Sequence, residues 1–291
     1  MTCPKITVIT ACLNAARTIE TTIRSVLDQN YPNLEYIIID GVSTDGTLDI
    51  IDKYRDKITK IVSEPDKGIY DAFNKGVALA TGDLISILNA DDFYAPWTFR
   101  LVSQAYRKHP EAGVFYGNLC FFSDVHKFCW YPSYTPFLND ELKKHMILGH
   151  PTFFVNKTTY QRYPTFDLKY KIAADWDWAL QFYVDGGEFY RIDGVLAFFR
   201  WGGASDKIIS LTMEETTIIK KYAQYSQLKT WFIACERIFG RLLMRILDKI
   251  HLFEIYLKYL SLHYNSSVLV ERMDSCEYWP VMKTYLSEKV R

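Results

Sequence analysis

Apolar and amphipathic segments alternate regularly along the first 115 residues of the chain. Short runs rich in β-branched residues predict buried strands, and segments with apolar residues every three or four positions predict helices. The predicted strands cover residues 6–12, 34–39, 59–63, 84–88 and 114–116, and the predicted helices cover about 14–29, 47–57, 69–80 and 96–108. This alternation predicts an α/β fold with a doubly wound, mostly parallel sheet and helices on both faces.

A polar segment follows each of the first four predicted strands. These segments are residues 12–14, 40–46, 64–68 and 89–92. Right-handed crossovers place the carboxyl ends of parallel strands at one edge of the sheet, where ligands bind in open α/β folds. We therefore expect the four segments to converge on one site.

The pattern changes after residue 117. Residues 119–137 are rich in aromatic residues and proline, and they predict a short antiparallel excursion or a flap. Residues 148–155 predict a turn that enters a buried strand, and residues 188–200 predict two strand pieces. Between them, a helix is expected from about residue 173 to Val184.

Beyond about residue 207 the pattern is helical. Arg237, Arg241, Arg245 and Lys249 recur every four residues among apolar side chains, which predicts a basic amphipathic helix. Such helices often lie on anionic bilayers. The alternative is that the apolar face packs on the rest of the protein and the arginines are solvated. We favour contact with a membrane surface.

Composition excludes several classes of protein. Lys and Arg together number 34, as do Asp and Glu, so no net charge attracts the chain to nucleic acid. The six cysteines form no Cys-x-x-Cys pair and are expected to be buried thiols in a reducing cytoplasm. Neither a signal-peptide core nor a run of 18 uncharged apolar residues is present, so we expect no membrane-spanning helix.

Two adjacent carboxylates follow the strand predicted at 84–88. In the segment Asn89-Ala90-Asp91-Asp92, they repel each other unless a cation lies beside them, and Mg²⁺ or Mn²⁺ bound there would bridge a diphosphate. The alternative is that Asp91 or Asp92 caps the next helix.

Three further polar residues are candidates for ligand binding or catalysis. Asp40 ends a predicted strand and suits a nucleobase or ribose, or else forms an Asx turn. Lys67 on the 64–68 loop could neutralise phosphate, or be solvated. Asp175, in an apolar frame at a helix start, suits a general base or a helix cap. Asp177 would point to a different side of that helix, so we expect only one of the two to face the site.

Several motifs are missing from the sequence. There is no Gly-x-Gly-x-x-Gly after the first strand, no Gly-x-x-x-x-Gly-Lys-Ser/Thr and no nucleophile elbow. These absences argue against a dinucleotide cofactor, a P-loop and a serine hydrolase.

Six segments together resemble the family 2 glycosyltransferases of the GT-A fold, of the type that builds bacterial surface polysaccharides. The segments are residues 9–14 (ITACLN), 39–47 (IDGVSTDGT), 68–76 (GIYDAFNKG), 88–92 (LNADD), 149–154 (GHPTFF) and 174–175 (AD). The resemblance covers about residues 4–205. It implies an inverting transferase that moves a sugar from a nucleotide-diphosphate sugar, a UDP-sugar by preference, to a saccharide acceptor on a lipid carrier.

The resemblance also implies roles for individual residues. Asp175 would be the catalytic base, Asp91 and Asp92 the metal site for Mg²⁺ or Mn²⁺, and His150 and Trp176 acceptor contacts. Residues 200–203 would form a loop over the diphosphate. The residues expected to bind the nucleotide sugar are Thr10, Ala11, Asn14, Asp40, Lys67, Asn74, Asn89, Ala90, Arg200 and Trp201.

Three positions depart from the family pattern. Asn89 stands where the first Asp of Asp-x-Asp is usual, Asp40-Gly41-Val42 stands where Asp-Asp-Gly is usual, and Ala174 replaces the Glu of a Glu-Asp pair. Asn89 and Ala174 favour, as an alternative, a nucleotide-sugar-binding protein without transferase activity. A processive synthase is disfavoured because no membrane span is predicted.

The expected organisation is a catalytic domain at 1–205 and a helical, basic extension at 206–291. Residues 1–117 would bind the nucleotide sugar and residues 118–205 would form the acceptor side. The expected location is cytoplasmic, peripheral on the inner face of the cell membrane.

Overall fold

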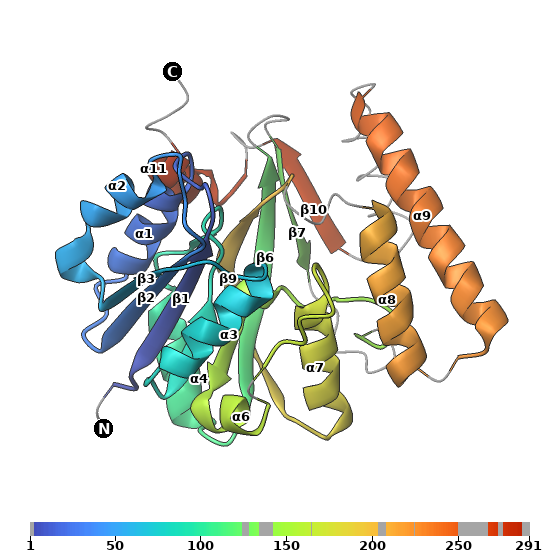
Figure 1. Ribbon diagram of the computed structural model, residues 1–291, viewed down its shortest axis with the longest axis horizontal. Helices are drawn as coiled ribbons and strands as arrows, with labels where there is room; N and C mark the ends of the chain where they lie inside the picture. The colour runs from blue at the N-terminus through green and yellow to red at the C-terminus, as the bar shows by residue number, and fades with distance from the viewer. Residues whose placement is uncertain are drawn as a thin grey trace.

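The computed structural model describes residues 3–123, 128–133, 142–163, 165–202, 208–223, 225–249, 267–272 and 276–286. A twisted central sheet carries helices on both faces (Figure 1). In space its main strands follow the order β10-β7-β6-β8-β4-β1-β2-β3, while β5 pairs with β9 and β9 also pairs with β6. The strands are β1 (Ile6–Cys12), β2 (Leu34–Asp40), β3 (Lys60–Ser63), β4 (Leu84–Ile87), β5 (Phe93–Tyr94), β6 (Val114–Ser123), β7 (Phe128–Ser133), β8 (Phe154–Asn156), β9 (Phe189–Arg200) and β10 (Ser267–Arg272).

Helices cover the sheet and extend beyond it on one side (Figure 1). They are α1 (Ile19–Leu27), α2 (Thr47–Asp52), α3 (Ile69–Leu79), α4 (Thr98–Lys108), α6 (Lys157–Arg162), α7 (Ala174–Val184), α8 (Ile208–Tyr222), α9 (Gln227–Lys249) and α11 (Trp279–Leu286), with 3₁₀ turns η1 (Arg55–Lys57) and η2 (His150–Thr152). The predicted doubly wound α/β fold is confirmed. The sequence did not predict β5, α6, β10 or α11.

The first four strands form the parallel half of the sheet. β1 lies between β2 and β4, and β3 pairs with β2. Cys12 lies opposite Asp40, and Asp40 lies opposite Ser63, so three strands end side by side. This alignment follows from the shared direction of the strands, and it brings the polar segments after them to one edge.

Antiparallel pairs occur in the second half of the sheet. β8 is inserted between β4 and β6 and runs antiparallel to both. β7 returns along β6, which confirms the antiparallel excursion predicted after residue 117. β9 is one strand of 12 residues rather than two pieces. Its register against β6 shifts near Asn118, and Gly194 has a φ of +122°, so a local irregularity replaces the predicted break.

The core consists of one apolar layer on each face of the sheet. Ile9, Ile39 and Ile87 point to the layer that contains residues of α3 and α7. Val8 and Ile38 point to the layer that contains residues of α1 and α4. Because both faces are covered, these strands are buried on both sides and mainly apolar, which is why the sequence shows runs rather than strict alternation.

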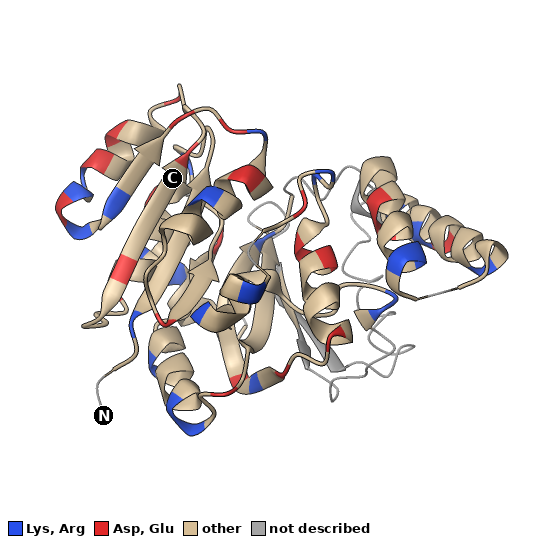
Figure 2. Ribbon diagram, turned by 60° about the horizontal axis from the view of Figure 1, so that its bottom comes forward, with Lys and Arg blue, Asp and Glu red and all other residues tan. Residues whose placement is uncertain are grey.

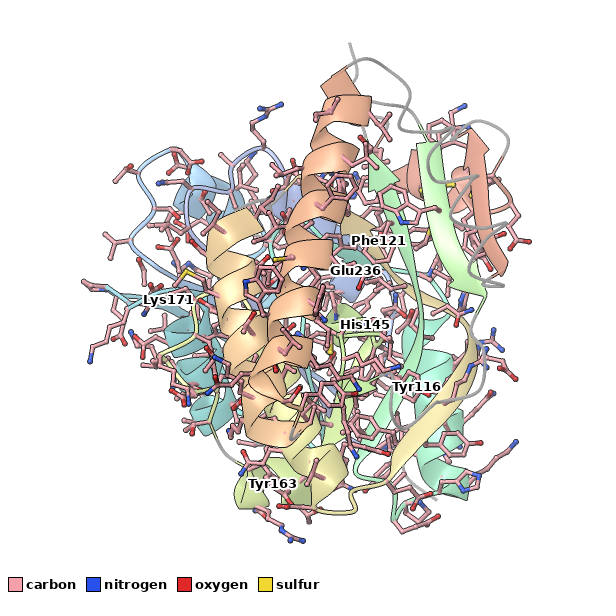
Figure 3. The ribbon with its side chains drawn as sticks, turned by 90° about the vertical axis from the view of Figure 1, so that its right-hand side faces the viewer. Tyr116, Phe121, His145, Tyr163, Lys171 and Glu236 are labelled. Carbon is pink, nitrogen blue, oxygen red and sulfur yellow. The ribbon has the colours of Figure 1, made fainter. Side chains whose placement is uncertain are left out.

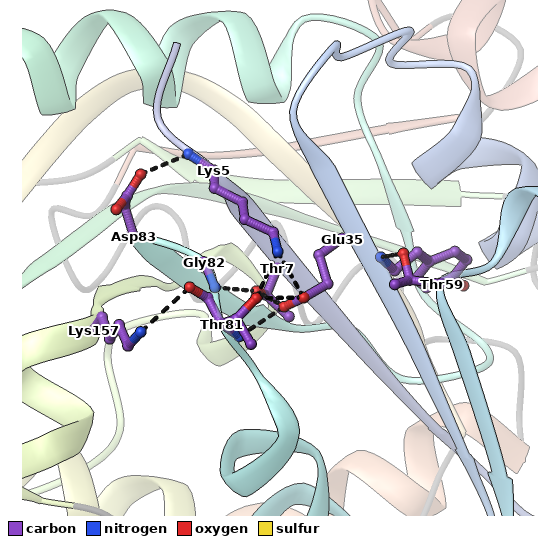
Figure 4. A network of polar contacts seen from close by, with 9 residues as sticks. Lys5, Thr7, Glu35, Thr59, Thr81, Gly82, Asp83 and Lys157 are labelled. Atoms are coloured by element: carbon purple, nitrogen blue, oxygen red, sulfur yellow. Dashed lines mark hydrogen bonds and ion pairs between the residues drawn. The ribbon is translucent and has the colours of Figure 1, made fainter. Parts of the chain in front are cut away.

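A network of polar contacts links the amino-terminal ends of the parallel strands, opposite the edge where the polar segments meet (Figure 4). The Glu35 carboxylate accepts hydrogen bonds from Lys5 Nζ at 2.8 Å, from Thr7 Oγ1 at 2.6 Å, and from the backbone N–H of Thr81 at 2.7 Å. Burial opposes ionisation of Glu35, but these hydrogen bonds prevail and lower its pKa to about 2. The network ties β2 to β1 and to the turn that enters β4.

The C-terminal segment is mainly helical, as predicted, but it also returns to the sheet. β10 adds an antiparallel edge strand beside β7. Helix α11 lies against α1 (Figure 1), where the Thr21 hydroxyl donates to the Tyr285 carbonyl at 3.1 Å and the Tyr285 ring lies 5.5 Å from that of Phe93. The predicted boundary at 205/206 lies outside the described residues.

The sequence left open that α9 packs its apolar face on the protein and exposes its arginines, but the structure shows the opposite orientation. Arg237 and Arg241 face α8 and form ion pairs with the buried carboxylate of Glu215, at 2.9 Å and 2.7 Å. Large apolar side chains of α9 are exposed instead. The side chains of Arg245 and Lys249 lie outside the described part of the structure. Among the described residues, no helix combines the length and apolarity needed to cross a bilayer.

In the part of the chain that the structure describes, acidic and basic residues are interspersed along the helices and loops (Figure 2), in keeping with their equal numbers in the sequence.

Candidate active site

The polar segments after the first strands meet, as predicted. The backbone N–H of Asn14 donates to Ser43 Oγ at 2.8 Å, and Asn14 Oδ1 accepts from the backbone N–H of Thr44 at 2.9 Å. The loop after β3 is joined by a hydrogen bond from the N–H of Glu64 to the carbonyl of Asp40 at 3.0 Å. These bonds hold three loops as one rim.

Asp40 is the buried centre of this rim. Its carboxylate accepts hydrogen bonds from Ser63 Oγ at 2.6 Å, Ser43 Oγ at 2.5 Å and the N–H of Val42 at 3.1 Å. Val42 has a φ of +66°, unusual for a β-branched residue, and these bonds help to hold the turn in that conformation. Asp40 is fully buried. It therefore shapes the rim and has no exposed oxygen for a ligand.

Next to the rim lies an open cleft of about 430 Å³. Its walls come from the end of β1, the start of α3, the segment after β4, η2 and the turn before α7. This volume lies in the range of small-ligand sites. The lining residues are Ala11, Cys12, Leu13, Asn14, Ala15, Thr18, Ile69, Tyr70, Phe73, Asn89, Ala90, Asp91, His150, Pro151, Lys171, Ile172, Asp175 and Phe199.

The Asn89–Asp92 segment forms part of the wall of this cleft. Asp91 lines the cleft, whereas Asp92 is fully buried behind it. Asp92 accepts hydrogen bonds from the backbone N–H of Arg200 at 3.1 Å and from Asn89 Nδ2 at 3.2 Å. Burial and then the neighbouring Asp91 raise the pKa of Asp92 well above its usual range. Asp92 thus supports the segment from behind, rather than facing the cleft as a second metal ligand.

Arg200 lies beside the carboxylate pair. Its Nε is 3.4 Å from the Asp91 carbonyl oxygen, and its guanidinium lies over the Phe122 ring at 4.9 Å. Burial raises the pKa of Asp91, and the positive charge of Arg200 opposes that rise. The guanidinium therefore provides part of the positive charge that two adjacent carboxylates require.

Asp175 also lines the cleft, from the first turn of α7. The Tyr70 hydroxyl lies 3.0 Å from Asp175 Oδ1 and 2.6 Å from the Ile172 carbonyl oxygen. Burial, and then the charge of Asp175, raise the pKa of Tyr70 far above its usual range, so the phenol keeps its proton. Tyr70 can therefore orient the carboxylate without competing as a base.

The two acidic residues of α7 point to different sides, as expected. Asp175 lines the cleft, while Asp177 is buried and binds Lys221 of α8 at 3.0 Å. Their separation of two positions places them about 200° apart around a helix. Asp175 alone is thus available to a ligand.

His150 forms an aromatic wall of the cleft. Its ring stacks on Phe73 at 5.8 Å and contacts the edges of Phe153 and Phe166. Burial lowers the pKa of His150, although Asp175 opposes this shift, so the imidazole is neutral near pH 7. An uncharged, polar-edged ring of this kind suits contact with a sugar.

A carboxylate from α8 holds the turn that carries Asp175. Glu214 accepts hydrogen bonds from the backbone N–H groups of Lys171 at 2.7 Å, Ile172 at 2.9 Å and Ala173 at 2.9 Å. These N–H groups lie just before α7, where a negative charge is also favoured by the helix dipole. The C-terminal segment therefore contributes directly to the geometry of the cleft.

Several residues expected to bind ligand lie elsewhere. Thr10 is buried against the Tyr36 hydroxyl at 3.1 Å. Asn74 forms two hydrogen bonds with the backbone of Phe166, at 2.9 Å and 2.7 Å. Trp176 is 1% exposed, and its indole N–H donates to the Leu142 carbonyl at 2.8 Å. The side chains of these three residues join elements of the core and do not line the cleft, so direct ligand contact by them stays a prediction.

The remaining predicted residues divide between the cleft and its margin. Ala11, Asn14, Asn89 and Ala90 line the cleft. Lys67 is exposed on the rim, and its carbonyl oxygen lies 3.5 Å from Lys171 Nζ. Trp201 packs its ring edge against Trp130, at 5.2 Å, outside the cleft lining. Gly203 of the predicted loop lies outside the described residues.

Sequence reasoning missed four contributors to the site. Tyr70 and Phe73 lie inside the matched segment 68–76, so the motif could have pointed to them. Lys171 and Glu214 lie in segments with no distinguishing pattern. Their roles depend on contacts between distant parts of the chain, which local sequence does not reveal.

The residues at Asp91 fit a divalent cation that also binds substrate oxygens. Asn89 Oδ1 is buried and has no hydrogen-bond partner, and Asp91 borders the same cleft. Within the described part of the chain, no three His, Cys, Asp or Glu side chains gather as a metal-binding group. A cation here would depend on Asp91, the Asn89 oxygen and phosphate oxygens, which is the donor set that Mg²⁺ favours.

Comparison with known proteins agrees with this fold and cleft. The family model described as glycosyl transferase family 2 matches residues 7–165, more than half of the chain. The chain therefore belongs to glycosyl transferase family 2 and is a nucleotide-sugar-dependent glycosyltransferase. A PGL/p-HBAD biosynthesis glycosyltransferase of Mycobacterium tuberculosis (strain H37Ra) is 29% identical over 215 residues, which cover 72% of this chain and 82% of that protein.

Two solved structures share the fold. Staphylococcus aureus TarS 1–349 in complex with UDP-GlcNAc superposes with a TM-score of 0.59 at 17% identity, over 81% of this chain and 72% of that one. The mannosyltransferase PcManGT from Pyrobaculum calidifontis, in complex with GDP-Man and Mn²⁺, gives 0.60 at 18% identity, over 99% and 86%. The GT-A fold expected from the resemblance is confirmed.

Proposed function

We propose that the protein transfers a sugar from a UDP-sugar, with inversion, to a hydroxyl group of a lipid-linked saccharide during surface polysaccharide biosynthesis at the inner face of the cell membrane. One observation carries the proposal: Asp91 and Asp175 both line a single cleft. The relatives support it, because one acts in PGL/p-HBAD biosynthesis and one structural neighbour binds UDP-GlcNAc.

The geometry supports a single displacement. Asp175, oriented by Tyr70, takes the proton of the acceptor hydroxyl. The acceptor oxygen forms a bond to the anomeric carbon as the bond from that carbon to the diphosphate oxygen breaks, and the electron pair leaves with the nucleoside diphosphate. Since no covalent intermediate forms, one carboxylate at this position is sufficient.

The diphosphate end of the cleft would be stabilised by charge. Asp91 and Asn89 would hold Mg²⁺ or Mn²⁺, which when bound supplies positive charge to the diphosphate. Arg200 lies beside Asp91, and Lys171 lines the cleft. His150 would face the transferred sugar or the acceptor.

Donor turnover by the Asp175→Asn variant tests this assignment. UDP release from a panel of UDP-sugars with Mn²⁺ should fall by about 10²–10⁴-fold, because that is the usual contribution of a general base. UDP binding measured by calorimetry should be unchanged. Asp177→Asn is the matched control, since Asp177 lies on the same helix but faces Lys221. Transfer by Asp175→Asn at nearly the wild-type rate would remove Asp175 from this role.

The non-catalytic binding protein considered from the sequence is set aside, because the chain is a glycosyltransferase by its family. The replacement of the usual Glu by Ala174 does not remove a carboxylate from the cleft. Position 174 is fully buried, so a Glu side chain there could reach the cleft only if the residue turned away from the core.

A further inference from the structure

The outward face of α9 is an exposed apolar stripe. Its residues follow one another at steps of three and four, so they lie on one side of the helix over about 27 Å. The exposed fractions of its large apolar side chains range from 47% for Leu242 to 70% for Phe239, and Cys235 is also exposed. We call this surface the outer stripe: Leu228, Phe232, Cys235, Phe239, Leu242 and Ile246.

The orientation of this stripe is fixed by ion pairs on the opposite side of the helix. Arg237 and Arg241 both contact Glu215 of α8, and Arg241 also donates to Thr212 Oγ1 at 2.7 Å. The Arg237 guanidinium lies over the Trp176 ring at 5.6 Å. Turning the stripe inward would leave the Glu215 carboxylate buried and unpaired, at a high cost. The outer stripe is therefore held away from the protein.

The outer stripe is accessible from solvent because of where α9 lies in the molecule. Helices α7, α8 and α9 follow one another outward from the sheet, and α9 is the outermost (Figure 1). When the right-hand side of Figure 1 faces the viewer, α9 is the nearest helix, and it carries Glu236 (Figure 3). Glu236 is the only acidic residue among the side chains of α9 that the structure describes.

We propose that the outer stripe inserts into a lipid bilayer and holds the enzyme on it by apolar contact. Phe232 and Phe239, with the neighbouring Trp231 at 59% exposure, are the kind of side chain that partitions into the bilayer interface.

This mode of attachment differs from the one expected from the sequence. Arg237 and Arg241 are paired with Glu215, so these two arginines are not free to attract anionic lipids. Binding should therefore depend on apolar burial rather than on surface charge. The inference rests on the proposed function only for the lipid-linked nature of the acceptor.

Flotation of the full-length protein with vesicles tests the proposal. The wild type should bind pure phosphatidylcholine vesicles, and high salt should leave that binding unchanged. The Phe239→Gln/Leu242→Gln variant removes two apolar side chains with a residue that favours helix, and should bind roughly 10- to 100-fold more weakly. Val184→Gln is the matched control, because Val184 is 51% exposed at the end of α7.

Each other outcome overturns the proposal in a recognisable way. Binding only to phosphatidylglycerol-containing vesicles, abolished by salt, would assign attachment to charge. A wild-type dimer that the double variant converts to monomer in light scattering would assign the stripe to a second copy of the chain. Equal flotation of wild type and double variant would remove the stripe from attachment. UDP binding by the double variant, measured in solution, separates these results from failure of the proposed transferase activity.

Discussion

Asn89 lines the cleft beside the adjacent carboxylates Asp91 and Asp92. Its amide nitrogen donates to Asp92, and its oxygen is buried without a partner. An Asp at this position would place a third carboxylate beside Asp91 and Asp92 and remove the donor. The Asn therefore lets the segment fold with a bound cation absent, while leaving one oxygen for ligand binding.

This reading predicts the behaviour of Asn89→Asp. Without metal, the variant should lose about 1–3 kcal/mol of stability, because a buried carboxylate loses its hydrogen-bond donor and gains a like charge. Mn²⁺ should raise the Tm of the variant more than that of the wild type. The measurement is thermal unfolding with EDTA and with Mn²⁺, and Asn33→Asp at an exposed position is the control. Equal stability of variant and wild type in EDTA would contradict it.

At the scale of elements, the start of α7 is held from two directions. Tyr70 of α3 contacts Asp175 from one side, and Glu214 of α8 binds the three preceding N–H groups from the other. The position of the candidate base is thus set by two helices that lie far apart in the sequence. Helix α8 is part of the site although it follows the family-matched region.

Glu214→Gln should loosen this turn. An amide offers one acceptor oxygen and no charge, so at least one N–H loses its partner. We expect kcat to fall by roughly tenfold, with little change in the KM for donor, because the diphosphate end is untouched. Hydrogen exchange at residues 171–173 should become faster, and Glu214→Asp should restore part of the protection. Unchanged exchange in Glu214→Gln would show that the turn is held by other contacts; Glu236→Gln, exposed on α9, is the control.

For the whole molecule, the Glu35 network links stability to pH. The folded-state pKa of Glu35 is about 2, below its usual value of 4.5, so the ionised form stabilises the fold. That contribution is complete above about pH 4.5 and is lost as the pH falls toward 2. Because the network joins β1, β2 and the entry to β4, its loss weakens the parallel half of the sheet.

Glu35→Gln should reduce the unfolding free energy by about 1–3 kcal/mol at pH 7, since Gln cannot accept all of the hydrogen bonds. Between pH 4.5 and 2 its stability should fall less steeply than that of the wild type. Urea unfolding at a series of pH values measures both effects, with Asp52→Asn, a surface residue paired with Arg55, as the control. Parallel curves for Glu35→Gln and wild type would contradict this assignment.

The sequence by itself determined the parallel half of the sheet and the edge where the site lies. Strand runs such as residues 84–88 are buried throughout and mainly apolar because both faces of the sheet are covered, so local composition was enough to place them. The polar residues at their ends then had to meet, because parallel strands share a direction. Asn14, Asn89 and Asp91 were therefore expected at one site from the sequence, and they line one cleft; Asp175 was assigned to the site by the family resemblance.

Tertiary structure alone decided which polar residues face the cleft and which face of α9 is exposed. Thr10, Asn74 and Trp176 looked equally suited to ligand, but each is held by a partner from another element. An amphipathic pattern gives two faces without saying which is inward. Glu215, a single buried carboxylate on α8, decides between the two orientations considered for α9, since burying it requires the arginines as partners.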